Sequence, residues 1–386
     1  MTQDIFPYPL KRIGIIGGGQ LGKMLAQAAK QMGFYVTVLD ATPHCPAAHI
    51  ADAQIVGELY DAEKLRALAE KSDVLTYEIE HIDTHTLKSL HDEGVMIYPS
   101  PAVLAIIQDK LTQKQVLAEQ GVPVPRFEAI EELTADVLAN VNLPIVQKAR
   151  RGGYDGKGVV VLKNRDDVKN ALQTPSMFEE FVDFTKELAI IIARSPSGET
   201  ACYPVVEMVF DDKTNICDIV AAPANIDNAI AEQARQVALQ AIEALAGVGV
   251  FGVEMFLTRA GHVLVNEIAP RPHNSGHYTI EACVTSQFEQ LIRVISGLPL
   301  GISDLLKPAA MLNLLGEAGY TGEPIIEGLP AALAIPGLSF HLYDKATTHP
   351  FRKMGHITIL DETVENAIAK IHRVKNSLKI KGKFPN

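Results

Sequence analysis

Short apolar segments alternate with helical segments through the first hundred residues, and this alternation restricts the fold more than any other feature. The apolar segments are 13–16, 35–39, 74–77 and 96–98. Helical spacing of apolar side chains fills the intervals 20–32 and 61–70. Short apolar strands that alternate with helices form a parallel sheet covered on both faces. We therefore predict an α/β fold for the N-terminal part of the chain.

A glycine turn, Gly17-Gly18-Gly19-Gln20-Leu21-Gly22, follows the first predicted strand and opens a predicted helix. Glycines allow the backbone to approach a phosphate, and a helix N-terminus offers unpaired N–H groups. Asp40 ends the second strand about 20 residues further on, where a nicotinamide-dinucleotide site keeps its ribose carboxylate. Three interpretations follow: a site for some other phosphate group, a dinucleotide site of an NAD-dependent oxidoreductase, or a tight turn that binds nothing.

The overall composition excludes several classes of protein. The formal net charge is −11, from 35 basic and 46 acidic residues, which is unfavourable for binding a nucleic-acid backbone. No apolar run approaches the ~18 residues of a membrane span, and the first residues do not resemble a secretory signal. The four cysteines form no C-x-x-C pair. We expect a cytoplasmic protein with no nucleic-acid or membrane partner.

Two glutamates in a predicted hairpin give the sharpest indication of chemistry. The segment 250–268 contains two apolar strands on either side of Ala260-Gly261. If these two residues form the turn, Glu254 lies opposite Glu267, with Cβ atoms about 5 Å apart on one face of the sheet. Two such carboxylates repel each other unless a cation lies between them, and Mg²⁺ that carries nucleotide phosphates suits this donor set. The alternative is a solvated edge in a shifted register.

A glycine-rich segment with basic residues precedes this hairpin. Lys148 ends a short strand, and four glycines fall within residues 152–158. This composition predicts a flexible flap that covers phosphates, with Lys148 supplying a fixed positive charge. The alternative is a solvent-exposed loop. Further along, residues 179–182 can present one C=O and one N–H to an adenine edge, and Glu187 can bind ribose hydroxyls.

The order of these features resembles the ATP-grasp superfamily and, within it, the N5-carboxyaminoimidazole ribonucleotide synthase family. The stretches that carry the resemblance are GGGQLGKM, TYEIEHI, QDKLTQKQ, ARRGGYDGKG, NEIAPRPHNSGHYT and FRKMGHIT, and they extend over nearly the whole chain. The related formate-dependent glycinamide ribonucleotide transformylases share the glycine turn but not ARRGGYDGKG or NEIAPRPHNSGHYT. A transformylase of that kind, an NAD-dependent oxidoreductase and a nucleotide sensor remain the alternatives.

The resemblance implies a domain plan and a reaction. It implies a Rossmann-like N-terminal domain at 1–108, a central ATP-grasp domain at 109–299 with a small β-rich lid at about 126–186, and a small mixed C-terminal domain at 300–386. ATP would phosphorylate bicarbonate to carboxyphosphate, and the resulting CO₂ would carboxylate 5-aminoimidazole ribonucleotide. The implied cofactors are ATP and two Mg²⁺ ions, and the implied assembly is a homodimer.

The resemblance also implies roles for individual residues. The ATP site would comprise Lys110, Lys148, Gly153, Tyr154, Asp155, Gly156, Lys157, Gly158, Val159, Glu179, Glu180, Phe181, Val182, Glu187, Asn266 and Glu267. Mg²⁺ would be held by Glu254 and Glu267. The ribonucleotide and bicarbonate would contact Gly19, Gln20, Leu21, Glu78, Tyr154, Asp155, Asn274, Ser275, His277, Lys345, Arg352 and Lys353. The catalytic residues would be Lys148, Arg271 and Asp155, with Asp155 as the proton shuttle. Phe210 departs from the family pattern, which has His near this position.

Overall fold

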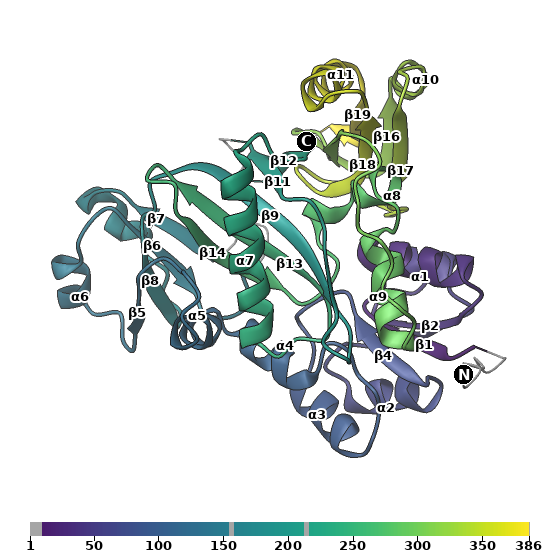
Figure 1. The fold of residues 1–386 in the computed structure, drawn as a ribbon, viewed down its shortest axis with the longest axis horizontal. Coiled ribbons are helices and arrows are strands. Elements are labelled where there is room, and N and C mark those ends of the chain that lie inside the picture. Colours follow the sequence, from purple (N-terminus) through teal and green to yellow (C-terminus); the bar gives the residue numbers. More distant parts are fainter. Residues whose placement is uncertain (1–9, 154–157, 212–215, 386) are drawn as a thin grey trace.

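The computed structural model describes residues 10–153, 158–211 and 216–385. Its N-terminal part contains a parallel sheet in the order β3-β2-β1-β4 (Figure 1). The strands are β1 (Arg12–Ile16), β2 (Tyr35–Asp40), β3 (Ala53–Val56) and β4 (Val74–Tyr77). The helices are α1 (Gln20–Gln31), a short 3-10 helix (Pro46–His49), α2 (Ala62–Glu70), α3 (Thr84–Asp92) and α4 (Pro101–Gln108). Apolar side chains of the sheet pack against α1 on one face and against α2 and α3 on the other, so the predicted α/β arrangement is confirmed.

The predicted strand at 96–98 is the exception. Only Ile97 pairs there, through a single parallel bridge to Leu75. Pro99 follows directly, and because proline has no N–H it cannot extend the ladder. The N-terminal sheet therefore has four strands, and the chain leaves its edge toward α4.

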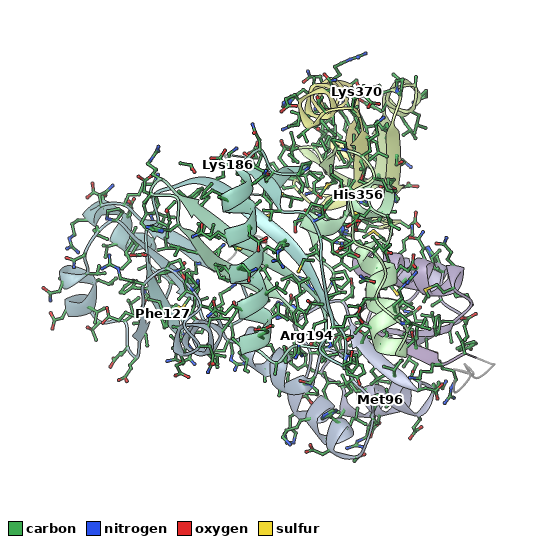
Figure 2. All side chains as sticks on the ribbon, in the orientation of Figure 1. Met96, Phe127, Lys186, Arg194, His356 and Lys370 are labelled. Carbon is green, nitrogen blue, oxygen red and sulfur yellow. The ribbon has the colours of Figure 1, made fainter. Side chains whose placement is uncertain are left out.

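A nine-stranded sheet forms the centre of the molecule, in the order β14-β13-β9-β11-β12-β15-β18-β17 with β10 beside β9. Its strands before residue 300 are β9 (Phe184–Arg194), β10 (Thr200–Cys202), β11 (Val206–Phe210), β12 (Cys217–Ala222), β13 (Gly249–Thr258) and β14 (Val263–Ala269). Lys186 and Arg194 lie near opposite ends of β9 (Figure 2). The helices and turns that accompany this part are α5 (Lys110–Glu119), α7 (Asn228–Ala244), a 3-10 turn (Asn274–Gly276), α8 (Thr279–Ala282) and α9 (Gln287–Ser296).

Both faces of this sheet are covered. Leu188, Ile190 and Ile192 of β9 pack with α7, whereas Ala189, Ile191 and Ala193 pack with α9 and α1. Because side chains alternate along a strand, Glu187 and the partner of Ala189, Glu254, lie on the α9 face. Figure 1 shows α7 in front of the sheet and α9 beside α1.

The C-terminal part shares this sheet. Its strands and helices are β15 (Ala309–Leu315), β16 (Tyr320–Glu327), α10 (Leu329–Leu333), β17 (Leu338–Leu342), β18 (Lys353–Leu360), α11 (Val364–Ser377) and β19 (Lys379–Pro385). β15 pairs with β12, so one ladder passes across the position where the third domain was predicted to begin. The domain limits 1–108, 109–299 and 300–386 stay predictions.

A separate antiparallel sheet, β5-β8-β6-β7, lies at the left of Figure 1 within the predicted lid. Its elements are β5 (Phe127–Ile130), α6 (Ala135–Asn140), β6 (Ile145–Ala149), β7 (Val159–Leu162), a 3-10 helix (Arg165–Asn170) and β8 (Ser176–Glu180). It has its own small apolar cluster around Ile130, Leu162 and Phe178. Among the helices of the described ranges, none combines the length and apolar character that crossing a bilayer requires.

Candidate active site

The hairpin of β13 and β14 places the two predicted metal ligands opposite each other. Glu254 and Glu267 are direct partners across the antiparallel pair, as the sequence predicted. The predicted two-residue turn is wrong, however. The loop has three residues, 259–261, because Thr258 N–H donates to His262 O (2.9 Å) and Gly261 adopts a left-handed conformation with φ of +80°.

A bulge at Asn266 compensates for the longer turn. Met255 pairs with Val265, yet the next residue back, Glu254, pairs with Glu267, so Asn266 is the extra residue. A bulge interrupts the alternation of side chains and redirects them locally. As a result both Asn266 and Glu267 reach cations of one cleft, since Asn266 accepts from Lys148 (2.8 Å) and Glu267 pairs with Lys110 (2.5 Å).

Three lysines gather over this bulge from two different elements. Lys110 and Lys114 lie one turn apart on α5, and Lys148 lies on β6 of the lid. Glu179 of β8 forms ion pairs with Lys148 (2.5 Å) and Lys114 (3.0 Å). The three lysines, with Gln113, Met177, Asn266 and Glu267, line a small pocket. The predicted ATP residues Lys110, Lys148, Glu179, Asn266 and Glu267 are therefore brought together.

Burial and neighbouring carboxylates shift the pKa values of these lysines in opposite directions. Burial opposes the charged form of Lys110, but Glu267 outweighs it and raises the pKa of Lys110. Lys114 is more deeply enclosed, and burial lowers its pKa to about 8 although Glu179 acts in the opposite direction. Burial would raise the pKa of Glu179, but Lys114 and Lys148 lower it. The pocket thus holds charged groups that are suited to an anion such as a phosphate.

The base of the predicted flap is fixed to α5. Asp109 caps this helix by accepting from the N–H groups of Leu111 and Thr112, and it also binds the Arg150 guanidinium (2.6 Å). Of the predicted flap residues, Gly153, Gly158 and Val159 are described, with Val159 paired to Lys148. Tyr154, Asp155, Gly156 and Lys157 lie outside the described residues.

The remaining predicted nucleotide residues lie between the lid and the central sheet. Glu180 ends β8 and pairs with Arg126 (2.7 Å), and Phe181 and Val182 connect β8 to β9. Burial, together with the nearby Glu254 carboxylate, raises the pKa of Glu187 to about 7. Glu187 therefore lies close to the proposed metal ligands.

The carboxylates fit a divalent ion that also carries phosphates. Glu267 keeps 47% of its side chain exposed, and Glu254 keeps 22%. Lys110 pairs with Glu267 (2.5 Å), and Nε2 of the His273 ring lies 3.1 Å from Glu254. The described residues contain no group of three or more His, Cys, Asp or Glu side chains placed to hold a metal by themselves. Mg²⁺ commonly uses one or two carboxylates and takes its other ligands from water and phosphate. The donor set therefore suits Mg²⁺ bound together with a nucleotide.

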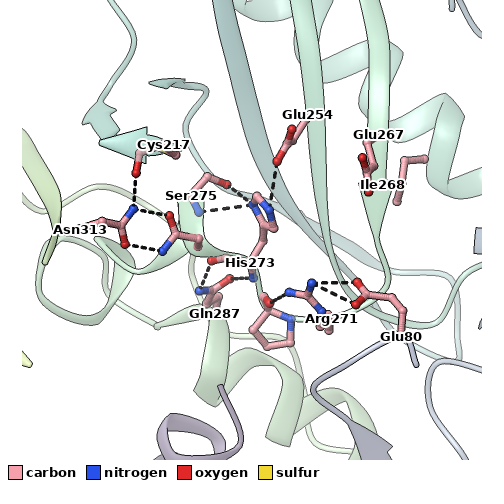
Figure 3. A network of polar contacts seen from close by, with 12 residues as sticks. Glu80, Cys217, Glu254, Glu267, Ile268, Arg271, His273, Ser275, Gln287 and Asn313 are labelled. Atoms are coloured by element: carbon pink, nitrogen blue, oxygen red, sulfur yellow. Dashed lines mark hydrogen bonds and ion pairs between the residues drawn. The ribbon is translucent and has the colours of Figure 1, made fainter. Parts of the chain in front are cut away.

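The loop that follows β14 carries further polar groups toward these carboxylates (Figure 3). Arg271 forms an ion pair with Glu80 (2.8 Å), and its Nε is buried without a hydrogen-bond partner in the described part of the chain. The ring of His273 accepts from Ser275 N–H at Nδ1 (3.3 Å), so Nε2 carries the proton and donates to Glu254 (3.1 Å).

Gln287, at the start of α9, binds the backbone of the loop at His273 (Figure 3). Its carbonyl oxygen accepts from His273 N–H (2.9 Å), and its amide nitrogen donates to His273 O (2.8 Å). The same amide nitrogen lies 3.2 Å from Nδ1 of His277. Because the backbone partners fix which end of the amide donates, the side chain has one orientation.

Three predicted substrate residues of this loop contact other groups of the protein. Asn274 makes a reciprocal amide pair with Asn313 (2.8 and 2.7 Å), which also donates to Cys217 O (2.9 Å). His277 is buried and its ring packs against that of His356. Ser275 is also buried and its hydroxyl lies 2.8 Å from the His273 ring. The substrate contacts assigned to Asn274, Ser275 and His277 stay predictions.

The glycine turn differs from the expectation of free N–H groups. Glu78 accepts from Gly19 N–H (2.6 Å) and Gly22 N–H (2.9 Å), and Asp40 accepts from Gly18 N–H (2.8 Å). A carboxylate at a helix N-terminus is favoured by the helix dipole. Three N–H groups of the turn are thus already used, and both oxygens of Asp40 accept backbone hydrogen bonds, from Gly18 and Thr42. This arrangement disfavours the dinucleotide interpretation. Gln20 and Leu21 begin α1 directly beside this turn.

The segment that carries the predicted phosphate residues from the far end of the chain is joined to α1, the helix that follows this turn. Lys23 of α1 donates to Leu342 O (3.0 Å) and pairs with Asp344, which joins α1 to the segment between β17 and β18. That segment carries Lys345, whose ammonium group donates to Lys353 O (2.7 Å). Arg352 is directed along the segment to Thr347 O (2.7 Å). Residues more than 300 positions apart are therefore neighbours here.

Sequence reasoning missed three groups of this site: Lys114, the His273 ring as a partner of Glu254, and Gln287. Lys114 had a signal, because it lies four residues after Lys110 and shares its helix face. Gln287 had none, since its contacts depend on packing between distant segments.

Family comparisons agree with this arrangement over most of the chain. Residues 10–108 match the ribonucleotide synthetase preATP-grasp domain, residues 115–288 match the ATP-grasp domain, and residues 309–370 match the phosphoribosylaminoimidazole carboxylase C-terminal domain. The chain is similar to the N5-carboxyaminoimidazole ribonucleotide synthase of Synechococcus elongatus, at 43% identity over 91% of this chain and 90% of the relative. It spans about two thirds of the length of the first phosphoribosylaminoimidazole carboxylases that it matches: that of Vigna aconitifolia, described as chloroplastic, is 42% identical over 92% of this chain and 65% of the relative.

Solved structures give the same result. The N5-carboxyaminoimidazole ribonucleotide synthetase of Thermotoga maritima superposes with a TM-score of 0.91 at 55% identity, over 97% of this chain and all of that one. The N5-carboxyaminoimidazole synthase of Aspergillus clavatus, in complex with ADP and 5-aminoimidazole ribonucleotide, superposes with a TM-score of 0.87 at 36% identity, over 96% of this chain and 99% of that one.

Proposed function

The chain belongs to the N5-carboxyaminoimidazole ribonucleotide synthase family of ATP-grasp enzymes, and from this premise we propose that it carboxylates 5-aminoimidazole ribonucleotide with bicarbonate at the expense of ATP. The products are N5-carboxyaminoimidazole ribonucleotide, ADP and phosphate. The reaction is an ATP-dependent carbon–nitrogen ligation that proceeds through carboxyphosphate, and it belongs to de novo purine biosynthesis.

The lysines and glutamates of the cleft hold the nucleotide in this proposal. Lys110 and Lys148 bind phosphate oxygens, and the flap from Gly153 to Val159 closes over them. Glu180 to Val182 and Glu187 hold the adenine and ribose, beside Asn266, and Glu179 contributes to the same site through its pairs with Lys114 and Lys148. Glu254 and Glu267 would hold Mg²⁺, two ions in all, which neutralise charge on the phosphates when bound. Lys148 stabilises the charge that builds on the phosphoryl group during its transfer.

The second substrate lies toward the N-terminal part. Arg271, with a buried Nε and no partner for it in the described residues, offers a donor to bicarbonate. The ribonucleotide lies between the glycine turn with Glu78 and the segment with Lys345, Arg352 and Lys353, along the remaining residues that the sequence assigned to it. Asp155 acts as the proton shuttle. Because carboxyphosphate reacts with water, the lid must exclude solvent while CO₂ is transferred to the amine.

One observation carries the proposal: two carboxylates from paired strands face each other beneath lysines from both α5 and the lid. An NAD-dependent oxidoreductase has no use for this arrangement, and the Gly18 and Asp40 geometry also disfavours it. We also propose that the protein acts as a homodimer in the cytoplasm.

Phosphate release from Mg-ATP, measured with and without 5-aminoimidazole ribonucleotide in bicarbonate buffer, tests this function. We expect release that depends on the ribonucleotide, together with consumption of its free amine. ATP binding without turnover would indicate a nucleotide sensor. Release that requires formate and glycinamide ribonucleotide would indicate a transformylase.

A further inference from the structure

The charges around Glu179 are unequal, and this imbalance requires an explanation. Two buried ammonium groups, of Lys114 and Lys148, pair with the single buried carboxylate of Glu179. The group therefore carries one net positive charge. A desolvated excess charge is costly unless an anion neutralises it. Nucleotide phosphates would supply that anion.

Lys114 is the most deeply buried of the three lysines of the pocket. Only 2% of its surface is exposed, and the same is true of Glu179. Its ammonium group donates to Val265 O of β14 (2.9 Å) and pairs with Glu179 (3.0 Å). The Lys114 ammonium group lies at Oε2 of Glu179, whereas Lys148 contacts the other carboxylate oxygen, Oε1.

Lys148 has a different set of partners. It pairs with Glu179 (2.5 Å) and donates to Asn266 (2.8 Å), at the bulge beside Glu267. If Glu179 had Lys148 as its only counter-ion, turning Lys148 to a phosphate would leave a buried carboxylate unpaired, which is strongly unfavourable. With Lys114 in place, Glu179 keeps a partner while Lys148 engages the ligand.

We propose that Lys114 is a positioning residue for nucleotide binding, which neutralises Glu179 at Oε2 and thereby frees Lys148 for the phosphates. This inference rests on the proposed function, because it requires a nucleotide at Lys148. The competing explanation is structural: Lys114 only ties α5 to β14 through Val265 O.

A double-mutant cycle distinguishes the two explanations. The variants are Lys114→Met, Glu179→Gln and the double variant, and binding of Mg-ADP is measured by titration calorimetry. Lys114→Met should raise the Kd about tenfold or more, equivalent to about 1.4 kcal/mol. In the Glu179→Gln background no carboxylate competes for Lys148, so the same substitution should change the Kd by less than about threefold, a coupling that a cycle detects.

Steady-state kinetics provides the second measurement. Lys114→Met should raise KM for ATP and leave KM for 5-aminoimidazole ribonucleotide near the wild-type value. Lys88→Met is the matched control, because Lys88 is an exposed lysine on α3 that pairs with Asp92 (2.5 Å), and it should leave both constants unchanged.

An equal fold-change in the Kd for Mg-ADP in the two backgrounds, or an unchanged Kd in Lys114→Met, would overturn the inference and leave the proposed function intact. A wild-type protein that binds no Mg-ADP would overturn the proposed function and the inference with it. Should Lys114→Met fail to fold, the comparison of Glu179→Gln with the double variant decides, since a Kd difference above about tenfold contradicts a role through Glu179 and one below about threefold supports it.

Discussion

Replacing Glu267 by glutamine tests the metal site with the least change in shape. The side chain keeps its volume and loses its charge. In the nucleotide-free protein, Lys110 then loses its 2.5 Å partner. A fully buried pair would lose ~3–5 kcal/mol of stability when broken, but Glu267 is 47% exposed, so we expect roughly 1 kcal/mol. The effect on catalysis should be larger, because one of the two carboxylates that face each other across β13 and β14 no longer attracts the cation.

We expect Glu267→Gln to lower turnover by about 10²–10³-fold, equivalent to ~2.7–4 kcal/mol of transition-state stabilisation. The assay is phosphate release at rising Mg²⁺ concentration, with thermal denaturation of the same samples to separate folding from catalysis. Glu232→Gln, at an exposed position on α7, is the control and should behave as wild type. Near-normal turnover of Glu267→Gln at low Mg²⁺ would remove Glu267 from the metal site.

Two further variants test the neighbourhood of the site. Gln287→Leu leaves the His273 N–H without its side-chain partner and the His273 C=O with the Gly276 N–H alone, so we expect ~1–3 kcal/mol less stability and a lower kcat at little changed KM for ATP; kinetics that match wild type would show that this brace is dispensable. The pKa of Glu187 is raised from 4.5 to about 7 by burial and by Glu254, so the folded protein holds an extra proton between these values. The stabilisation that protonated Glu187 contributes is complete below pH 4.5 and is lost as the pH rises through 7. The free energy of unfolding of the nucleotide-free protein should therefore fall by on the order of 1–3 kcal/mol from this group. Urea denaturation at pH 5.5 and pH 8 should show a smaller fall for Glu187→Gln, and an identical fall in both proteins would contradict the assigned pKa.

Local sequence patterns predicted much of the fold. The alternation of short strands and helices predicted the N-terminal sheet, and its helices begin and end within two residues of the predicted limits. The family resemblance, which the comparisons confirm, supplied the central and C-terminal architecture. That β12 pairs with β15 could not be predicted, because the pairing joins segments about 90 residues apart.

The pairing of Glu254 with Glu267 was predicted correctly from an incorrect turn. A two-residue turn at Ala260-Gly261 and a regular ladder place Glu254 opposite Glu267, and so do the observed three-residue turn and the bulge at Asn266. The two deviations cancel from this pair onward, because Val253 with Ile268 and Gly252 with Ala269 also keep the predicted register. Strand alternation predicts register, but a bulge adds one residue without a strong sequence signal.

Side-chain partners were the least predictable part of the site. The glycine turn indicated N–H groups available to a phosphate, whereas Glu78 occupies two of them from the end of β4. Asn274 belongs to a stretch that resembles the family, yet its amide is paired with Asn313. Both outcomes depend on which distant segments pack together, and that information is not present in local sequence patterns.

The fate of a bicarbonate oxygen tests most directly the claim that this site transfers the γ-phosphoryl group of ATP to bicarbonate. The protein would be supplied with Mg-ATP, 5-aminoimidazole ribonucleotide and ¹⁸O-labelled bicarbonate, and the released phosphate analysed by mass spectrometry. Attack by a bicarbonate oxygen forms a P–O bond that survives when carboxyphosphate loses CO₂, so we expect one labelled oxygen in the phosphate. Phosphate that carries label only when the water is labelled would show direct hydrolysis of ATP and contradict the account.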